Sequence, residues 1–452
     1  MSGLIATSNR RAVIGAGITG RSVARFLTAR NMPFDWFDTR ASEVNLKLAD
    51  GELLEAPLQF GELSDDRLCG YDEIILSPGL AKTEPYVVEA ENVGAKIIGD
   101  IELFARHVEV PVAAITGSNG KSSVTKLLAE VAQASGRNAI AAGNLGEPVL
   151  DQLNRDYDLY VLELSSFQLE TTSSLKPAAA VILNMSPDHM DRYPSMIEYH
   201  AAKRRIHFGA TGIVTNRDDL LTQALSGDAN IHISFGFDEP DLGQYGLRVK
   251  GGRTYVARGL ELLFDVDRVE LRGRHNLSNA LAVLAMAEVL DLNQQQTIET
   301  ILAFRGLPHR CESIQGSNKV SWINDSKATN AGAAIAAITG MVDWVNKAGG
   351  QLILIAGGQS KGQDFSGFGK IVSENCKQLI LIGEDAQQIE KSVDGAILVS
   401  RAESMQEAVL QASRLAGDGD CVLLSPACAS FDQFDGYQDR GNQFRQAVEA
   451  LK

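Results

Sequence analysis

The chain has 452 residues, of which 44% are hydrophobic and 22% are charged, and its formal net charge at pH 7 is −15. This length predicts roughly two to four domains, and the composition is that of an ordinary globular protein. The acidic balance excludes nucleic-acid binding, because phosphate backbones are held by clustered Lys and Arg. It does not exclude small anions, which local groups can bind.

The sequence carries no targeting or membrane signal. No apolar segment precedes the first strand-like run, and no apolar run is long enough to cross a bilayer. The five cysteines are odd in number and show no Cys-x-x-Cys spacing, which favours free thiols over a disulfide frame or a zinc site. We therefore expect a cytoplasmic protein without membrane insertion.

Short apolar or β-branched runs alternate with helical patterns along the whole chain, which predicts parallel α/β layers. The runs fall into three segments, residues 1–99, 100–306 and 307–452, which we take as three domains. In the first segment we expect strands at 12–14, 34–38, 73–76 and 96–98.

A Gly-rich turn follows the first strand at residues 15–20, and Asp38 ends the next strand about 20 residues later. This pattern satisfies the dinucleotide fingerprint and, taken alone, predicts an NAD-binding oxidoreductase. A tight turn, space for a pyrophosphate and a helix N-terminus nevertheless suit any nucleotide diphosphate. Polar residues at 38–40 and the turn at 77–79 would complete the same pocket.

The second segment contains expected strands at 112–116, 159–163, 179–183 and 213–215. Hairpin-like alternation from about 231 to 271 suggests an added antiparallel element. A long Ala/Leu-rich helix is expected at 278–290.

The strongest local motif is the Gly-x-x-Gly-Lys-Ser stretch at residues 117–122, between an apolar strand and an amphipathic helix. Such a loop points backbone N–H groups at a phosphate, its Lys121 reaches the β- and γ-phosphates, and Ser122 can ligate Mg²⁺. The usual pattern has another Gly where this chain has Ile115. We expect ATP to bind here.

Two further loops follow strands of the same segment. Glu163 ends a strand next to the phosphate loop, where a magnesium ligand belongs, but it reads equally well as an ordinary exposed acid. The loop at 188–193 is dense in Asp and His, and His189 could ligate a metal or be merely structural. Lys203, in a basic helical stretch, reads by default as part of a solvated helix face.

The third segment has expected strands at 320–324, 351–356, 378–382, 396–399 and 421–425. With these motifs in order, the sequence resembles the Mur ligase family over essentially its whole length. The matching stretches are 116–122, 162–170, 188–193, 273–276, 307–310, 322–330 and 424–430. The resemblance implies an amino-terminal Rossmann-like domain for a UDP moiety, a central P-loop ATPase-like domain with a mostly parallel sheet, and a carboxyl-terminal Rossmann-like domain.

The resemblance also implies a ligase that uses ATP to activate a carboxylate as an acyl phosphate, which an amino acid's amine attacks. It assigns an ATP-binding role to Gly117, Asn119, Gly120, Lys121, Ser122, Ser123, Asn276, Asn279, Arg310 and Asp325. One Mg²⁺ would be held by Ser122 and Glu163, and a second by His189 and Lys203, with Lys203 as a carbamate. The catalytic side chains are then Lys121, His189 and Lys203.

The remaining assignments concern the two substrates that are joined. The residues implied for the UDP-linked substrate are Ile18, Thr19, Asp38, Thr39, Arg40, Ser77, Gly79 and Asn144. Those implied for the amino acid are Lys327, Thr329, Lys361, Ser430 and Tyr437. Tyr437 stands where family members are expected to have Phe.

The incoming amino acid is expected to be D-glutamate. Family members that add a diamino acid carry an Asp-Asn-Pro-Arg-like motif that this chain lacks, and Lys361 can instead meet a compact carboxylate. The resemblance thus implies addition of D-glutamate to UDP-N-acetylmuramoyl-L-alanine, a step of peptidoglycan precursor synthesis, by a monomer.

Two other readings leave features of the sequence unexplained. An oxidoreductase would need NAD(P) and would have no use for the phosphate loop. A non-enzymatic nucleotide switch would use that loop but not the later Lys, Asp and Ser loops.

Overall fold

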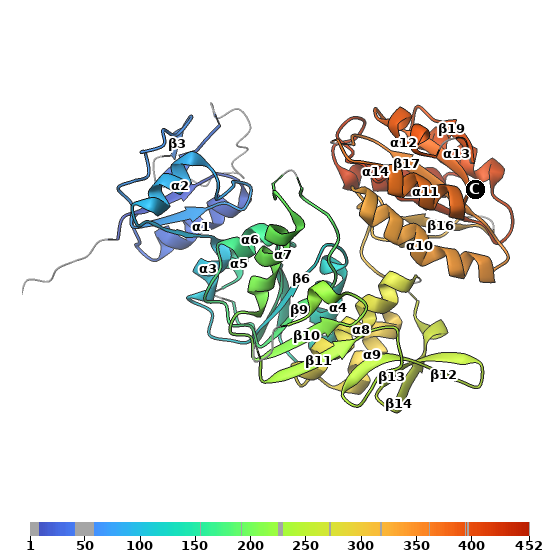
Figure 1. The fold of residues 1–452 in the computed structure, drawn as a ribbon, viewed down its shortest axis with the longest axis horizontal. Coiled ribbons are helices and arrows are strands. Elements are labelled where there is room, and N and C mark those ends of the chain that lie inside the picture. Colours follow the sequence, from blue (N-terminus) through green and yellow to red (C-terminus); the bar gives the residue numbers. More distant parts are fainter. Residues whose placement is uncertain are drawn as a thin grey trace, which may run out of the picture.

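The computed structural model describes residues 9–40, 58–153, 155–190, 192–224, 229–270, 273–316, 319–360, 362–393, 395 and 397–451. Within these ranges the chain builds three sheets in succession, of five, nine and six strands. Each sheet belongs to its own body, and the first and third bodies stand on opposite sides above the central one (Figure 1). The expected three-domain α/β architecture is confirmed, while the boundaries at 99/100 and 306/307 stay predictions.

The first sheet has the order β3-β2-β1-β4-β5, and its strands are all parallel. Its elements are β1 (Arg11–Ile14), α1 (Ile18–Ala29), β2 (Asp35–Asp38), β3 (Leu58–Phe60), β4 (Glu73–Leu76), α2 (Pro85–Asn92) and β5 (Lys96–Ile98). Because the connections leave β1 and β4 in opposite directions, the loops after these two strands flank a crevice where ligands bind in such sheets. The sequence did not predict β3, which has only three residues.

The central sheet has the order β14-β13-β12-β11-β10-β9-β6-β8-β7. Its strands are β6 (Val112–Thr116), β7 (Ala139–Gly143), β8 (Leu159–Glu163), β9 (Ala179–Ile182), β10 (Gly212–Asn216), β11 (Ile231–Phe235), β12 (Gln244–Lys250), β13 (Arg253–Arg258) and β14 (Glu261–Asp265). The expected antiparallel element is wrong for β11, which pairs parallel with β10, and right for β12 to β14. The sequence also missed β7.

The helices of the central body cover both faces of this sheet. They are α3 (Asp100–Ala105), α4 (Lys121–Ala134), α5 (Val149–Gln152), α6 (Ser166–Glu170), α7 (Met196–Arg204), α8 (Arg274–Val289) and α9 (Gln294–Ala303), with short 3₁₀ turns η1 (Arg205–His207), η2 (Leu220–Thr222) and η3 (Val266–Arg268). Helix α8 begins four residues earlier than expected, at Arg274. Within the described ranges, no helix is long and apolar enough to cross a membrane.

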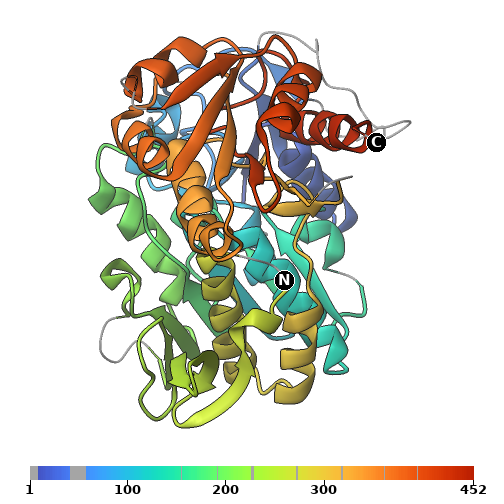
Figure 2. The same cartoon turned by 90° about the vertical axis from the view of Figure 1, so that its right-hand side faces the viewer.

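The third sheet has the order β15-β16-β20-β17-β18-β19, parallel except for the edge strand β15. Its elements are β15 (Glu312–Ile314), β16 (Ser321–Asn324), α10 (Ala331–Lys347), β17 (Leu352–Gly357), α11 (Ser366–Asn375), β18 (Cys376–Ile382), α12 (Ala386–Ser392), β19 (Leu398–Arg401), α13 (Met405–Leu415), β20 (Cys421–Leu424) and α14 (Tyr437–Glu449). Helix α10 rests on α8 of the central body, as the turned view shows (Figure 2).

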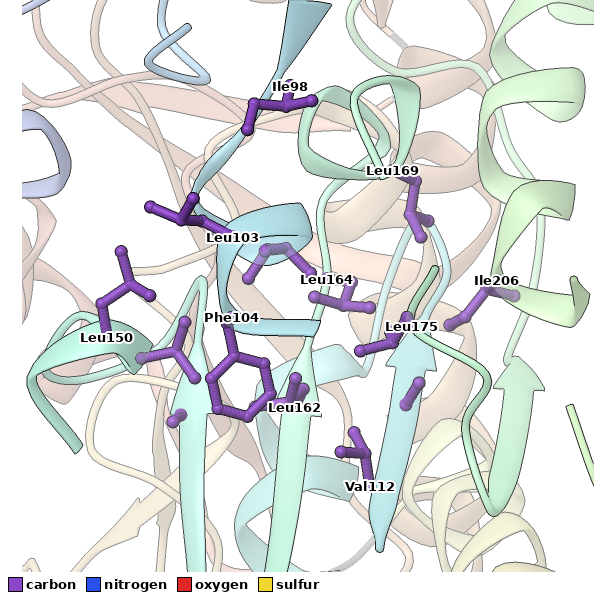
Figure 3. Packing of buried hydrophobic residues seen from close by; sticks show 14 of the residues in the cluster. Ile98, Leu103, Phe104, Val112, Leu150, Leu162, Leu164, Leu169, Leu175 and Ile206 are labelled. Carbon is purple, nitrogen blue, oxygen red and sulfur yellow. The ribbon is translucent and has the colours of Figure 1, made fainter. Parts of the chain in front are cut away.

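The first and central bodies share one apolar core. A single cluster of buried side chains includes Val13 and Trp36 from the first sheet together with Leu162 from the central sheet. Figure 3 shows the Phe104 ring beside Leu162, with Leu150 on its other side. Phe104 is fully buried and meets Tyr160 edge to face, with ring centroids 5.0 Å apart. Helix α3 also contacts α1 of the first body, so it anchors the junction between the two bodies.

We predict that Phe104→Ala destabilises the protein by about 3–5 kcal/mol, the usual cost of a large-to-small change in a core that cannot collapse. Phe104→Leu should cost clearly less, because most of the buried volume is kept. The midpoint of urea unfolding, followed by circular dichroism, measures both. Equal midpoints for the two variants and the unaltered protein would refute the anchoring role of this ring.

Candidate active site

The phosphate loop joins β6 to α4 and is shaped by glycines. Gly117 and Gly120 have φ values of 152° and 84°, in the region that side chains disfavour. A Cβ on Gly120 would also lie 2.5 Å from Asn279 Oδ1, so Asn279 of α8 packs directly on the loop. Ile115, where the usual motif has Gly, is a buried residue of β6. The loop therefore begins after the strand, at Gly117.

Lys121 lies over this loop. Its Nζ donates to the carbonyl oxygens of Gly117 at 2.8 Å and Ser118 at 2.9 Å. Burial lowers the pKa of Lys121, and Glu163 and Asp188 act in the opposite direction. Its ammonium is held where the loop's backbone turns toward a phosphate.

Ser122, Glu163 and Arg310 form one hydrogen-bonded group drawn from two bodies. The Ser122 hydroxyl donates to a carboxylate oxygen of Glu163, and Arg310 Nη2 donates to the same hydroxyl at 2.7 Å. Asn144, expected on the UDP-linked substrate, here donates its Nδ2 to the other Glu163 oxygen at 2.9 Å. Glu163 is buried, so the reading of it as an ordinary exposed acid is wrong.

This pair of oxygen ligands fits magnesium. A hydroxyl and a carboxylate are hard ligands, and Mg²⁺ in phosphate-binding sites commonly takes one or two carboxylates, with waters and phosphate oxygens completing its shell. Among the described residues, no group of three or more His, Cys, Asp and Glu side chains is placed to hold a metal by itself. Ser122 and Glu163 therefore suit an ion that arrives with a nucleotide.

Lys203 was read by default as part of a solvated helix face, and that reading is wrong. Its side chain, on α7, is only 2% exposed and points at the phosphate loop. Lys203 Nζ donates to Gly117 O at 3.0 Å and to Thr116 Oγ1 at 3.3 Å. Burial, together with the nearby charge of Lys121, drives the pKa of Lys203 well below its usual value.

His189 lies on the more open side of this group, with its side chain 48% exposed. Its backbone is left-handed, with a φ of 57°, and its Nε2 is 3.7 Å from Asp188 Oδ2. The imidazole meets the Phe167 ring edge-on, with centroids 4.9 Å apart. Asp188 also acts electrostatically on Lys121 and Lys203, so the expected metal loop does border the phosphate loop.

A small hollow beside the phosphate loop is lined by polar Ser123, Asn276 and Asn279 and by apolar Leu127, Ile301 and Phe304. Asn276 and Asn279 were both expected to contact ATP, and the structure places them together on the first turns of α8.

Arg310 lies on the connection between the central and third bodies, and its neighbours are conformationally unusual. His309 and Cys311, on either side, have left-handed φ values of 63° and 48°. Asp325, expected to contact ATP, instead accepts hydrogen bonds from Cys311 N at 3.2 Å and Ser425 Oγ at 2.8 Å. Burial raises the pKa of Asp325 to about 7. In this structure Asp325 supports the segment that carries Arg310.

The residues expected to bind the amino acid approach the same place from the third body. Lys327 Nζ lies 4.0 Å from the centroid of the Tyr437 ring, and burial lowers the pKa of Lys327 to about 8, with Arg310 adding to the effect. Thr329 is half-buried and Ser430 is buried. Lys361, like Asp191 of the metal loop, lies outside the described residues.

The sequence reasoning missed Arg440, which organises these third-body loops. Its guanidinium is fully buried and donates to Ser326 O at 2.8 Å, Ser326 Oγ at 3.0 Å and Cys428 O at 3.1 Å. Burial lowers the pKa of Arg440 to about 10. The helical periodicity of the sequence could have indicated that Arg440 is buried, because it falls on the same face of α14 as the buried Phe444 and Val448.

Asn184 was also missed. Its Oδ1 accepts from Asn119 N at 2.8 Å while its Nδ2 donates to Asn119 O at 3.0 Å, which clamps the backbone of the phosphate loop on both sides of the Asn119 Cα. Asn184 immediately follows the strand expected at 179–183, and a polar residue at the carboxyl end of a strand is the signal that pointed to Glu163.

The Gly-rich turn of the first body is closely packed. A Cβ on Gly15, whose φ is 101°, would lie 2.5 Å from Ser77 Oγ, so the two loops expected to bind UDP touch. Asp38 accepts from Ala16 N at 2.7 Å and pairs with both ends of the Arg40 guanidinium. Although burial opposes it, these bonds hold the pKa of Asp38 below its usual value.

The other residues expected to bind UDP lie around this turn. Ile18 is 73% exposed, Thr19 and Thr39 are half-buried, and Gly79 is exposed.

Comparison with known proteins covers almost the entire chain. Residues 9–99 match the Mur ligase MurD-like N-terminal domain, 115–287 the Mur ligase middle domain and 309–428 the Mur ligase glutamate ligase domain. UDP-N-acetylmuramoylalanine–D-glutamate ligase of Pseudomonas syringae pv. tomato is 45% identical over 448 residues, which is 99% of each chain. The enzyme of that name from Marinobacter nauticus is 43% identical, over 99% of this chain and 100% of its own.

Solved structures share the fold at lower identity. A UDP-N-acetylmuramate–alanine ligase from Thermotoga maritima matches with a TM-score of 0.61 and 19% identity, over 98% of this chain and all of the other. A pseudomurein peptide ligase type C from Methanothermus fervidus matches with a TM-score of 0.62 and 20% identity over the same shares.

We predict that Asn184→Ala weakens binding of a non-hydrolysable ATP analogue about tenfold, because two hydrogen bonds that hold the backbone of Asn119 are lost. Titration calorimetry with Mg²⁺ measures the affinity. Asn375→Ala is a suitable control, since the amide of Asn375 donates only within its own helix, to Ile371 O at 2.8 Å. An unchanged affinity in Asn184→Ala would contradict the clamp.

Proposed function

The chain belongs to the Mur ligase family, and from that premise we infer that it is an ATP-dependent ligase joining D-glutamate to UDP-N-acetylmuramoyl-L-alanine. The inference is carried by identity along almost the whole chain to relatives named as D-glutamate ligases. The site agrees with it, because the phosphate loop, Glu163 and Arg310 meet at one point. The product is a precursor of peptidoglycan.

The reaction is an acyl activation followed by amide formation. A carboxylate oxygen of the UDP-linked substrate attacks the γ-phosphorus of ATP, and ADP leaves. The D-glutamate amine then attacks the carbonyl carbon of the acyl phosphate, the C–O bond to phosphate breaks, and the amine loses a proton. Lys121 and Arg310 are the cations placed to stabilise charge on the transferring phosphoryl group.

Magnesium fits this site in one position and is proposed in a second. Ser122 and Glu163 would hold the first ion and His189 with Lys203 the second, and such ions neutralise charge on the phosphates when bound. Burial and the nearby charge of Lys121 drive the pKa of Lys203 well below its usual value, which favours the neutral amine, the form that adds CO₂. A carbamate on Lys203 would supply an anionic oxygen ligand beside the cationic Lys121.

The two substrates would approach from opposite bodies. We assign the UDP moiety to the crevice between the Gly-rich turn and the Ser77 loop, with Asp38 and Arg40 at its edge. D-glutamate is assigned to Lys327, Thr329, Ser430 and Tyr437, together with Lys361. Because one chain provides all of these side chains, we propose that a monomer in the cytoplasm is the active unit.

The function is tested by phosphate release from ATP in the presence of UDP-N-acetylmuramoyl-L-alanine and Mg²⁺. We expect sustained release only when D-glutamate is added, and none with L-glutamate. If phosphate release instead required L-alanine or a diamino acid, the chain would have another activity of the family. No release with any combination would refute the ligase.

A second prediction concerns pH and Lys327. Below about pH 8 its ammonium is charged and can pair with a D-glutamate carboxylate; as pH rises through about 8 it loses that charge. The KM for D-glutamate should therefore rise above pH 8 in the unaltered enzyme. In Lys327→Arg the guanidinium stays protonated, so this rise should vanish. If the KM for D-glutamate depended on pH in the same way in both proteins, Lys327 would not be the residue that binds the amino acid.

A further inference from the structure

Arg192 joins the central body to the first one at the loop assigned to UDP. It lies in the metal loop after β9, residues 188–193, and its Nη1 donates to Pro78 O at 2.9 Å while its Nη2 donates to Leu80 O at 2.7 Å. Both acceptors are backbone carbonyls of the turn after β4, in which Leu80 N donates to Ser77 O. A planar guanidinium can meet two carbonyls at once, which an ammonium cannot reproduce.

The guanidinium is fixed from its other side by α6. Its carbon lies 3.9 Å from the centroid of the Phe167 ring, and its Nη2 is 3.8 Å from Glu170 Oε2. The Arg192 side chain is 16% exposed. Helix α6 begins three residues after Glu163, so the group that holds Arg192 is itself attached to the phosphate-binding end of the sheet.

The stretch that begins this loop is bonded to the phosphate loop. Ser118 Oγ donates to Ser186 O at 2.8 Å and accepts from Ser186 N at 2.9 Å. The Asn184 clamp on Asn119 lies beside this pair. The segment after β9 thus contacts the phosphate loop near its start and the Ser77 loop through Arg192.

We propose that Arg192 is a positioning residue that couples the two nucleotide sites, so that ATP bound at the phosphate loop favours UDP-N-acetylmuramoyl-L-alanine at the Ser77 loop. This inference rests on the proposed function. An ordered phosphate loop fixes the segment after β9, and Arg192 transmits that order to the carbonyls of Pro78 and Leu80. Thermodynamic linkage requires the effect to be reciprocal.

The same two bodies offer a matched control. Arg25 of α1 pairs with Asp151 of α5, its Nη2 lying 2.6 Å from Asp151 Oδ2. This ion pair also crosses between the first and central bodies, but it joins helices α1 and α5 rather than the phosphate loop and the Ser77 loop. Arg25→Met therefore removes a bridge between the bodies without altering the Ser77 loop.

The test is titration calorimetry of UDP-N-acetylmuramoyl-L-alanine with and without a non-hydrolysable ATP analogue. In the unaltered protein and in Arg25→Met, we expect the analogue to tighten binding of the UDP-linked substrate about tenfold. In Arg192→Lys and Arg192→Met this ratio should fall to about one, with unchanged affinity for the analogue alone. The KM for the UDP-linked substrate should rise more than kcat falls.

Hydrogen exchange distinguishes this coupling from a merely structural role of Arg192. The analogue should protect the amides of Ser77, Gly79 and Leu80 in the unaltered protein but not in Arg192→Lys, whose thermal unfolding midpoint should match that of the unaltered protein. Retention of the tenfold ratio in both Arg192 variants overturns the coupling, as does its loss in Arg25→Met. A protein that turns over ATP without any UDP-linked substrate would refute the proposed function itself.

Discussion

The carbonyl oxygen of Gly117 accepts a hydrogen bond from Lys121 at 2.8 Å and another from Lys203 at 3.0 Å. Two amines that share one buried acceptor cannot both keep a proton easily, because desolvation and mutual repulsion each disfavour the second charge. Lys203 is the amine whose pKa is driven well below its usual value. The shared carbonyl thus holds two buried amines close together, and burial lowers the pKa of both, that of Lys203 more strongly.

Parallel strand order brings the partners of that carbonyl together. β6 lies between β8 and β9, so the phosphate loop, Glu163 and the Asn184 segment leave the sheet side by side at its carboxyl edge. Lys203 reaches the same edge from α7, and Arg310 reaches it from the connection to the third body. The chemistry is therefore assembled by topology from residues far apart in the sequence.

The sequence predicts well those features whose signal is local. The phosphate loop lies within one strand–loop–helix unit, and Glu163 is marked by its place at a strand end. The burial of Lys203 has no such signal, since the polar pattern of α7 is that of a surface helix and only its packing against the phosphate loop reveals its position. Asn184 follows a strand end as Glu163 does, but its partner Asn119 is distant in the sequence, so only the structure shows what it holds.

The joints between the three bodies differ in kind, and this difference decides which of them can open. Val13 and Trp36 of the first body share an apolar cluster with Leu162 of the central one, so separating these bodies would expose apolar surface to water. Among the described residues, the apolar clusters of the third body contain no side chain of the central body. The third body rests on the central one through α10 and α8, and at the active site it is joined by polar groups such as Arg310 and Ser122, which water can solvate when they part. Opening between the central and third bodies therefore divides none of the third body's apolar clusters, whereas separating the first two divides a shared one, and it also uncovers the phosphate loop.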